Sequence, residues 1–325
     1  PQWNIAACMV AMQFAEVWGA TIDEGSAYGM PNIEIVVDAD ALQHNDFRTM
    51  LGLFLESYER RRHVTVRLVR ETHDEASVEW PADDLVGGVV TLNLPRAAYE
   101  AKGVESLFDN LAAHARAAFA ALVEKRNFLE RLFAFGGVGP LAALAFRYRS
   151  RAYADPHHAR YVLGVTGLNE CVQHMSGEEL HGSPAATECA HAFLQLLCDE
   201  AETFSAQEQI RIVVGGDASA TCAKRFARID LQQHSDAARS VIKRDAITRD
   251  ATYTPGVCTT RRIHSIDGID LECQLHTQMD AAATTPIAIE SSDMTLATIE
   301  AIIEDALTRT KCRAMRFVCG REQMD

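Results

Sequence analysis

The pattern of hydrophobic and polar positions changes period repeatedly along the chain. Val64, Val66 and Leu68 alternate with polar residues, which predicts a strand with one buried face. Residues 32–37 form an apolar run that suits a buried strand. Residues 104–133 instead form a long, alanine-rich stretch of high helix propensity. Strand-like and helix-like periods that alternate in this way predict an α/β fold.

The same alternation continues toward both ends of the chain. Ser183 followed by Pro184 is a typical helix start, because serine caps the first backbone N–H groups and proline has no N–H to leave unpaired. Residues 88–94 are expected to form a strand that Pro95 ends. Further helices are expected at 5–20, 46–61, 168–174, 184–202, 218–228 and 294–310, and further strands at 161–165, 210–214, 286–289 and 314–318.

Composition narrows the classes of protein that fit this pattern. With 325 residues, 48% of them hydrophobic, the chain can build a sizeable core, and we expect a single domain over residues 1–325. The net charge of −14 disfavours binding to nucleic acid, which needs a basic face. No apolar run approaches the roughly 20 residues that span a bilayer, so no membrane insertion is expected.

The nine cysteines indicate a reducing compartment rather than a disulfide framework. Their number is odd and no CxxC pair occurs, so we expect free thiols, no metal site and no cofactor. The expected location is therefore intracellular, either the cytoplasm or an organelle matrix such as that of the mitochondrion. A Cys–His nucleophilic pair stays open, because its members need only meet in space.

Two segments carry a resemblance to a known family. Residues 88–102 contain an apolar strand, Asn93, Pro95-Arg96 and a Tyr-x-Ala-Lys helix start, and residues 161–170 contain a strand followed by Gly-x-Asn-Glu. Together they resemble the barrel of the anaerobic (class III) ribonucleotide reductases, which are glycyl radical enzymes. The resemblance implies a ten-stranded α/β barrel, incomplete or trimmed here. It places Asn93 beside the substrate nucleotide and puts Asn169 and Glu170 at the active-site end.

Two further segments extend the resemblance, which covers roughly residues 30 to 310. Residues 210–230 are similar to a strand, turn and helix that receive substrate phosphate in the family, and this gives Asp217 and Ser219 positions in the old site. A carboxylate at Asp217 would repel a triphosphate, and the residue suits a helix cap better. In residues 251–260 the family's Asn-Ser is replaced by Pro255-Gly256.

The reaction of the family needs parts that this sequence does not match. A thiyl radical must abstract hydrogen from the ribose, yet no cysteine occurs between Met9 and Glu170. The radical-glycine motif and the N-terminal nucleotide-sensing domain have no counterpart either. We therefore expect a pseudoenzyme that serves as a structural or accessory subunit, with other proteins of a larger complex as partners.

Two alternatives stay open. The chain begins at Pro1, so an initiator methionine was removed or further sequence precedes it. In the first alternative, the chain is part of a genuine anaerobic ribonucleoside-triphosphate reductase, whose radical cysteine and glycine lie on flanking sequence. Alternatively, the old site binds a nucleotide without chemistry, and the protein is a sensor.

Overall fold

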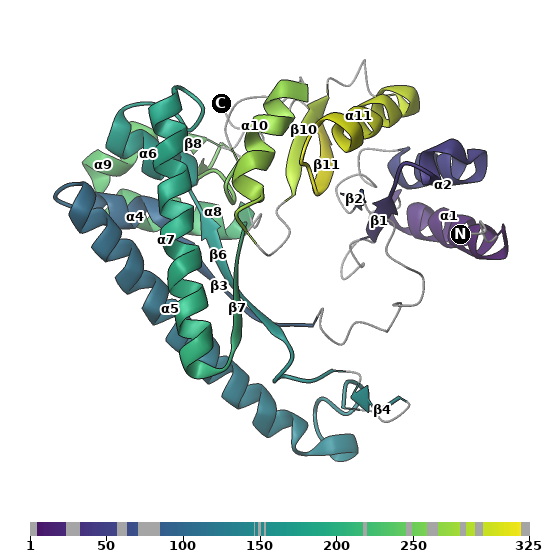
Figure 1. Ribbon diagram of the computed structural model, residues 1–325, viewed down its shortest axis with the longest axis horizontal. Helices are drawn as coiled ribbons and strands as arrows, with labels where there is room; N and C mark the ends of the chain where they lie inside the picture. The colour runs from purple at the N-terminus through teal and green to yellow at the C-terminus, as the bar shows by residue number, and fades with distance from the viewer. Residues whose placement is uncertain are drawn as a thin grey trace.

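The computed structural model describes most of the chain as an α/β structure (Figure 1). The described residues are 5–23, 33–56, 64–70, 85–145, 147–148, 151–152, 154–216, 220–244, 249–258, 266–279, 284–289 and 295–319. The α-helices are α1 (Ile5–Asp23), α2 (Asn45–Leu55), α4 (Leu94–Tyr99), α5 (Val104–Phe133), α6 (Leu168–Ser176), α7 (Pro184–Glu208), α8 (Ala220–Gln233), α9 (Ser235–Val241), α10 (Ile266–His276) and α11 (Leu296–Arg309). The strands are β1 (Ile33–Val37), β2 (Val64–Leu68), β3 (Val86–Asn93), β4 (Arg147–Tyr148), β5 (Arg151–Ala152), β6 (Arg160–Thr166), β7 (Arg211–Gly216), β8 (Lys243–Arg244), β9 (Ala251–Thr252), β10 (Thr285–Ile289) and β11 (Ala314–Cys319).

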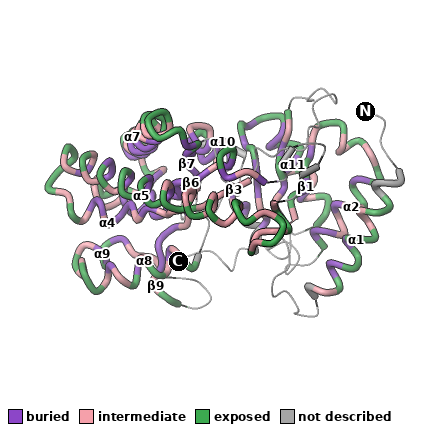
Figure 2. The backbone as a smooth tube through the Cα atoms, turned by 90° about the horizontal axis from the view of Figure 1, so that it is seen from below, coloured by how far each residue is buried: buried purple, intermediate pink, exposed green. Residues whose placement is uncertain are grey.

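A parallel sheet of three strands, in the order β3-β6-β7, forms the first half of the core. The long helices α5 and α7 pack against each other and against this sheet (Figure 1). Their small and aliphatic residues allow close approach, and Leu111, Ala115 and Phe119 of α5 are buried there. Figure 2 shows the buried positions gathered along this sheet and the helix faces beside it. Burial of β6 on both faces explains its near-continuous apolar sequence.

A second sheet of four strands, in the order β1-β2-β11-β10, forms a separate core. Its strand pairs β1/β2 and β10/β11 are parallel, whereas β2 and β11 are antiparallel. The alternation predicted for Val64, Val66 and Leu68 is confirmed, since all three are buried in this core. Helices α1, α2 and α11 supply Trp18, Leu51 and other apolar residues to it.

The mixed α/β fold is confirmed, but the expected ten-stranded barrel is not. Within the described residues the strands form the two sheets above and two short hairpins, β4/β5 and β8/β9. β3 and β7 each pair only with β6 there, so no continuous ring of hydrogen bonds closes. Closure needs strand pairing around a whole circle, and local sequence pattern cannot report that pairing. No helix in the described part of the chain is long and apolar enough to cross a bilayer.

Helix α10 joins the two cores. Leu275, near the C-terminal end of α10, packs into the core around the parallel sheet, together with Met279. Ile269 and Cys273 of the same helix pack into the core around the four-stranded sheet. One short helix therefore holds both halves of the described structure. The single domain predicted from the sequence stays a prediction.

A glycine fixes the junction between two of the family-like segments. Gly167 lies between β6 and α6 with a φ of +76°, a left-handed conformation that suits glycine. A Cβ atom built there would lie 2.6 Å from the ring of Pro95 in α4. The backbone of one segment thus touches the side chain of the other at a place where only glycine fits.

We predict that Gly167→Ala destabilises the protein more than Gly177→Ala does. Both glycines have a similar positive φ, but a Cβ at Gly177 meets nothing within 4 Å. Gly177→Ala should cost about 1–3 kcal/mol for backbone strain alone. Gly167→Ala should cost roughly 1–3 kcal/mol more, because of the clash with Pro95. Urea unfolding of both variants measures the difference, and equal costs would show that the contact with Pro95 is unimportant.

Candidate active site

The residues singled out from the sequence lie at one edge of the parallel sheet. Asn93 ends β3 and is paired in register with Thr166, which ends β6. Gly216 ends β7 and is paired with Val165, so all three strands end together. In parallel α/β sheets, ligands bind outside the carboxyl ends of the strands. This edge is therefore the candidate active site.

The expected site residues are placed there in part. Asn169 and Glu170 belong to the first turn of α6, directly after β6. Asp217 and Ser219 follow β7 in the sequence, but they lie outside the described residues. The helix cap predicted at Asp217 therefore stays a prediction.

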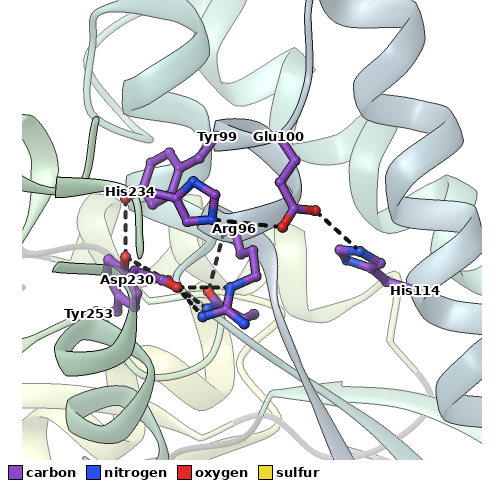
Figure 3. Close-up of polar contacts among 8 residues, drawn as sticks. Arg96, Tyr99, Glu100, His114, Asp230, His234 and Tyr253 are labelled. Atoms are coloured by element: carbon purple, nitrogen blue, oxygen red, sulfur yellow. Dashed lines mark hydrogen bonds and ion pairs between the residues drawn. The ribbon is translucent and has the colours of Figure 1, made fainter. Parts of the chain in front are cut away.

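A buried carboxylate, Asp230 of α8, gathers side chains from two other segments of the chain (Figure 3). Its Oδ2 atom accepts hydrogen bonds from Asn93 Nδ2 at 2.6 Å and from the Tyr253 hydroxyl at 2.9 Å. Its Oδ1 atom accepts from Arg96 Nε at 2.8 Å, and the terminal nitrogen of the same guanidinium forms an ion pair with it. Asp230 is completely buried, so these donors replace the water that an ionised carboxylate needs.

A pair of tyrosines extends this network away from Asp230. The hydroxyls of Tyr99 and Tyr253 lie 3.1 Å apart. Because Tyr253 donates its single hydrogen to Asp230, Tyr99 must be the donor to Tyr253. Burial raises the pKa of both phenols above the usual value, so both stay protonated near neutral pH. The hydrogen bonds therefore run in one direction, from Tyr99 through Tyr253 to Asp230.

Histidines and a glutamate surround the outer end of the network (Figure 3). The ring of Tyr99 meets the ring of His174 edge to face, with centroids 4.9 Å apart, and lies near His234. The carboxylate of Glu100 lies 3.7 Å from His234 Nε2 and 3.6 Å from His114 Nε2. These groups are partly exposed, so the polar network reaches the surface on this side.

A second buried carboxyl, Glu170, binds the segment after β9. Its Oε1 accepts from the backbone N–H of Thr254 at 3.0 Å and from the hydroxyl of Thr254 at 2.6 Å. The carbonyl of Thr254 in turn accepts from the N–H of Gly167 at 2.9 Å. Burial raises the pKa of Glu170 to about 7, because the lost hydration of its charged form outweighs the hydrogen bonds from Thr254 and the attraction of Lys243.

Many of the polar atoms that the structure describes at this edge are used inside the protein. Asn93 is also the N-cap of α4, since its Oδ1 accepts from the N–H of Arg96, and Asn169 Oδ1 accepts from the N–H of Leu180. By contrast, Asn169 Nδ2 and Glu170 Oε2 are buried without a hydrogen-bond partner. Buried polar atoms are nearly always paired, so these two atoms carry hydrogen-bonding capacity that the described residues leave unused.

One further group of described residues could hold a metal ion. It consists of Cys258, Glu272 and His276. Glu272 and His276 belong to α10, and Cys258 lies at the end of the segment after β9.

The structure adds residues that sequence reasoning missed. Arg96, Asp230, Tyr253 and Thr254 all lie in the four family-like segments, yet only Asn93, Asn169, Glu170, Asp217 and Ser219 were expected at the site. A signal was available, because Asp230 ends an Arg-Phe-x-x-x-Asp pattern and Tyr253 precedes Thr254 in the fourth segment. What the sequence could not give was their meeting, across 134 residues in the case of Arg96 and Asp230.

Comparisons with known proteins point to one family. The family model described as anaerobic ribonucleoside-triphosphate reductase matches residues 16–318. Among curated proteins, no sequence matches the chain.

Solved structures of anaerobic ribonucleotide reductases are similar to this chain in fold. The anaerobic ribonucleotide reductase from Thermotoga maritima with MES in the active site has a TM-score of 0.67 and 13% identity, over 98% of this chain and 53% of that chain. The same enzyme in complex with dATP and CTP has a TM-score of 0.64 and 14% identity, over 96% and 52%. Another structure, of an anaerobic ribonucleotide reductase, has a TM-score of 0.63 and 13% identity, over 96% and 49%. Such low identities show a shared fold alone, and the chain spans about half the length of these proteins.

These findings correct one expectation. The chain was predicted not to be an enzyme, on the ground that the radical cysteine and the radical glycine have no match in the sequence. That prediction is wrong, because the matching family model and the structural neighbours are all reductases. A missing motif shows only that the resemblance ends there.

Glu170 should give the stability of the protein a distinctive pH dependence. Its pKa is raised from 4.5 to about 7 in the folded chain, so the folded chain binds more protons than the unfolded chain between these values. The free energy of unfolding should therefore fall by about 3 kcal/mol as the pH rises through this window.

Chemical unfolding at a series of pH values measures this effect. Glu170→Gln keeps an oxygen that accepts from Thr254 and removes the ionisation, so the fall should disappear. Glu188→Gln, at an exposed position of α7, is the matched control and should keep the wild-type pH dependence. An unchanged pH dependence in Glu170→Gln would contradict the account of this carboxyl.

Proposed function

The chain belongs to the anaerobic ribonucleoside-triphosphate reductase family, and we propose that it binds a ribonucleotide as part of a ribonucleotide-reducing enzyme. The binding place is the edge where β3, β6 and β7 end. The observation that carries the proposal is the convergence of all four family-like segments there, through Asp230 and Glu170. A structure kept only for packing has no need of so many buried charged and polar groups, since such groups are costly to bury.

The hydrogen-bonding capacity of this edge suits a ribose. A ribose carries two neighbouring hydroxyls, and each can both donate and accept a hydrogen bond. Asn169 Nδ2 is a donor and Glu170 Oε2 an acceptor, or a donor when protonated, and both lack partners. With its pKa raised to about 7, Glu170 can take either role near neutral pH. The hydroxyls of a ribose bound at this edge would give both side chains the hydrogen-bond partners that they lack.

The network around Asp230 would hold this edge in shape. Asn93 and Arg96 are bound to Asp230, so the end of β3 and the start of α4 cannot shift independently of α8. Fixed polar groups lose little entropy when a ligand binds, which favours affinity. In the family a thiyl radical supplies the chemistry. The part proposed for this chain is to bind and orient the ribonucleotide.

The larger assembly stays a separate proposal. The chain aligns with about half of each reductase chain, so the activity of a complete reductase is proposed only for an enzyme of which this chain is a part. The accessory proteins expected as partners likewise stay a prediction.

Calorimetry with CTP, dCTP and cytidine tests the proposed binding, since CTP is bound in a reductase of the same fold. We expect CTP to bind with a dissociation constant at or below about 1 mM, in the usual range for an enzyme substrate. CTP should bind more tightly than dCTP, because only the ribose offers a 2′-hydroxyl to Asn169 and Glu170. No binding of CTP at that concentration would overturn the proposal, whereas equal binding of CTP and dCTP would favour a nucleotide sensor.

A variant that removes one negative charge tests where the phosphates of bound CTP lie. Asp217 directly follows the last residue of β7 in the sequence, and its carboxylate would repel a phosphate bound beyond the end of that strand. Asp217→Asn should therefore tighten CTP binding by about fivefold, or ~1 kcal/mol, with little effect on cytidine. Asp236→Asn makes the same charge change at the exposed start of α9 and is the control. Equal effects of the two variants would place the phosphate elsewhere.

A further inference from the structure

Three side chains of different chemistry converge at the end of residues 249–258, the segment that carries Tyr253 and Thr254 of the candidate active site. Glu272 and His276 are four residues apart on α10 and so lie on one face of the helix. Cys258 comes from the segment after β9. The sulfur, a carboxylate oxygen and a ring nitrogen all lie within 4.8 Å of one another. Glu272 is completely buried and His276 is only 3% exposed.

The imidazole of His276 is held in the way that a metal ligand needs. Its Nδ1 lies 3.3 Å from the hydroxyl oxygen of the buried Thr285, whereas its Nε2 is buried without a hydrogen-bond partner. In the tautomer that donates from Nδ1 to Thr285, the Nε2 atom carries a free lone pair. Metal-binding histidines usually donate their second ring N–H to such a neighbour, which fixes the tautomer and the ring orientation.

The protonation states around this cluster also suit a cation. Burial lowers the pKa of His276 to about 4, so the ring is neutral at physiological pH and can donate its lone pair. Burial and the neighbouring Glu272 raise the pKa of the Cys258 thiol, which hydrogen-bonds to that carboxylate. A divalent ion would replace the shared proton between sulfur and carboxylate and offset their negative charge.

We propose that Cys258, Glu272 and His276 bind a divalent transition-metal ion, with zinc as the best fit. A thiolate, an imidazole and a carboxylate are the three ligand types that zinc takes in proteins, at about 2.0–2.3 Å. Tetrahedral geometry at these lengths places ligand atoms roughly 3.6 Å apart, so small side-chain rotations from the present spacing suffice. Three protein ligands leave a fourth position for water. No metal site was expected from the sequence, because the chain contains no CxxC pair.

The binding step balances without any redox change. The zinc ion forms one bond each to the Cys258 sulfur, a Glu272 oxygen and His276 Nε2. The S–H bond of Cys258 breaks and its proton leaves to solvent. One proton is therefore released for each ion bound near neutral pH.

A metal ion bound by Cys258, Glu272 and His276 would lie between the segment 249–258 and α10, and so would connect them. Residues 249–258 carry Tyr253 and Thr254, which bind Asp230 and Glu170. α10 joins the two cores. A metal ion between Cys258 and α10 would tie the site to the helix that connects both halves of the structure. This inference does not depend on nucleotide binding.

The site is tested by adding Co²⁺ stepwise to the whole chain. The chain is first reduced, and a chelator first removes any metal. We expect one equivalent of Co²⁺ to bind, with the near-ultraviolet absorption of a thiolate-to-cobalt charge transfer, and Zn²⁺ to displace it. Cys258→Ser should abolish the charge-transfer absorption, and Glu272→Gln and His276→Gln should each weaken binding. Thr285→Val should weaken binding by about 10–100-fold, as loss of an orienting neighbour does.

The matched control is Cys189→Ser, a partly exposed cysteine of α7 that belongs to no such cluster. It should bind Co²⁺ as the wild type does. Circular dichroism without metal verifies that each variant is folded, and an unfolded Cys258→Ser would leave His276→Gln to decide the question. The proposal is overturned if the wild-type chain binds no Co²⁺ or Zn²⁺, or if the charge-transfer absorption persists in Cys258→Ser. No nucleotide is present, so failure here is distinct from failure of CTP binding.

Discussion

The candidate site depends on one buried carboxylate. An ionised group out of contact with water is tolerated only when charged or polar partners surround it, and Asp230 has three such partners from two other segments of the chain. Asn93 and Arg96 bring the end of β3 and the start of α4, and Tyr253 brings the segment after β9. If any of these partners moved away, the buried carboxylate would lose a hydrogen bond that water cannot replace. The carboxylate thereby fixes the relative positions of elements that share no strand pairing.

The neighbouring carboxyl extends this constraint to the rest of the sheet edge. Tyr253 and Thr254 are consecutive, and they bind Asp230 and Glu170 respectively. One dipeptide is thus held from two sides, by α8 and by α6. Gly167 permits this arrangement, because its lack of a side chain lets the turn before α6 approach Pro95. Hydrogen bonds to Asp230 and Glu170 thus hold the edge where a ribonucleotide is proposed to bind, and Glu170, with its pKa raised to about 7, can take up or release a proton near neutral pH.

Local features of the fold could be predicted from the sequence, and non-local ones could not. The bounds expected for α5, 104–133, are those observed, and Ser183 caps α7 through its side chain as its type suggests. Helix propensity and capping are properties of neighbouring residues. The division into two sheets depends on pairing between distant strands, such as β2 with β11, which no local pattern encodes. The same limit applies to the site, where the family-like segments were recognised but their meeting at Asp230 was not.

The measurement that tests this account most directly compares two carboxylate-to-amide variants by chemical unfolding. Asp230→Asn presents an amide N–H₂ to donors that need an acceptor, so it should destabilise the protein by about 1.5–3 kcal/mol, as loss of hydrogen bonds to a charged group does. Glu200→Gln alters a similar two-bond pair with Arg116, but on the surface, and should cost at most about 1 kcal/mol. A clear excess for Asp230→Asn is the predicted result. Equal and small costs would show that the structure does not depend on Asp230, and would contradict the account.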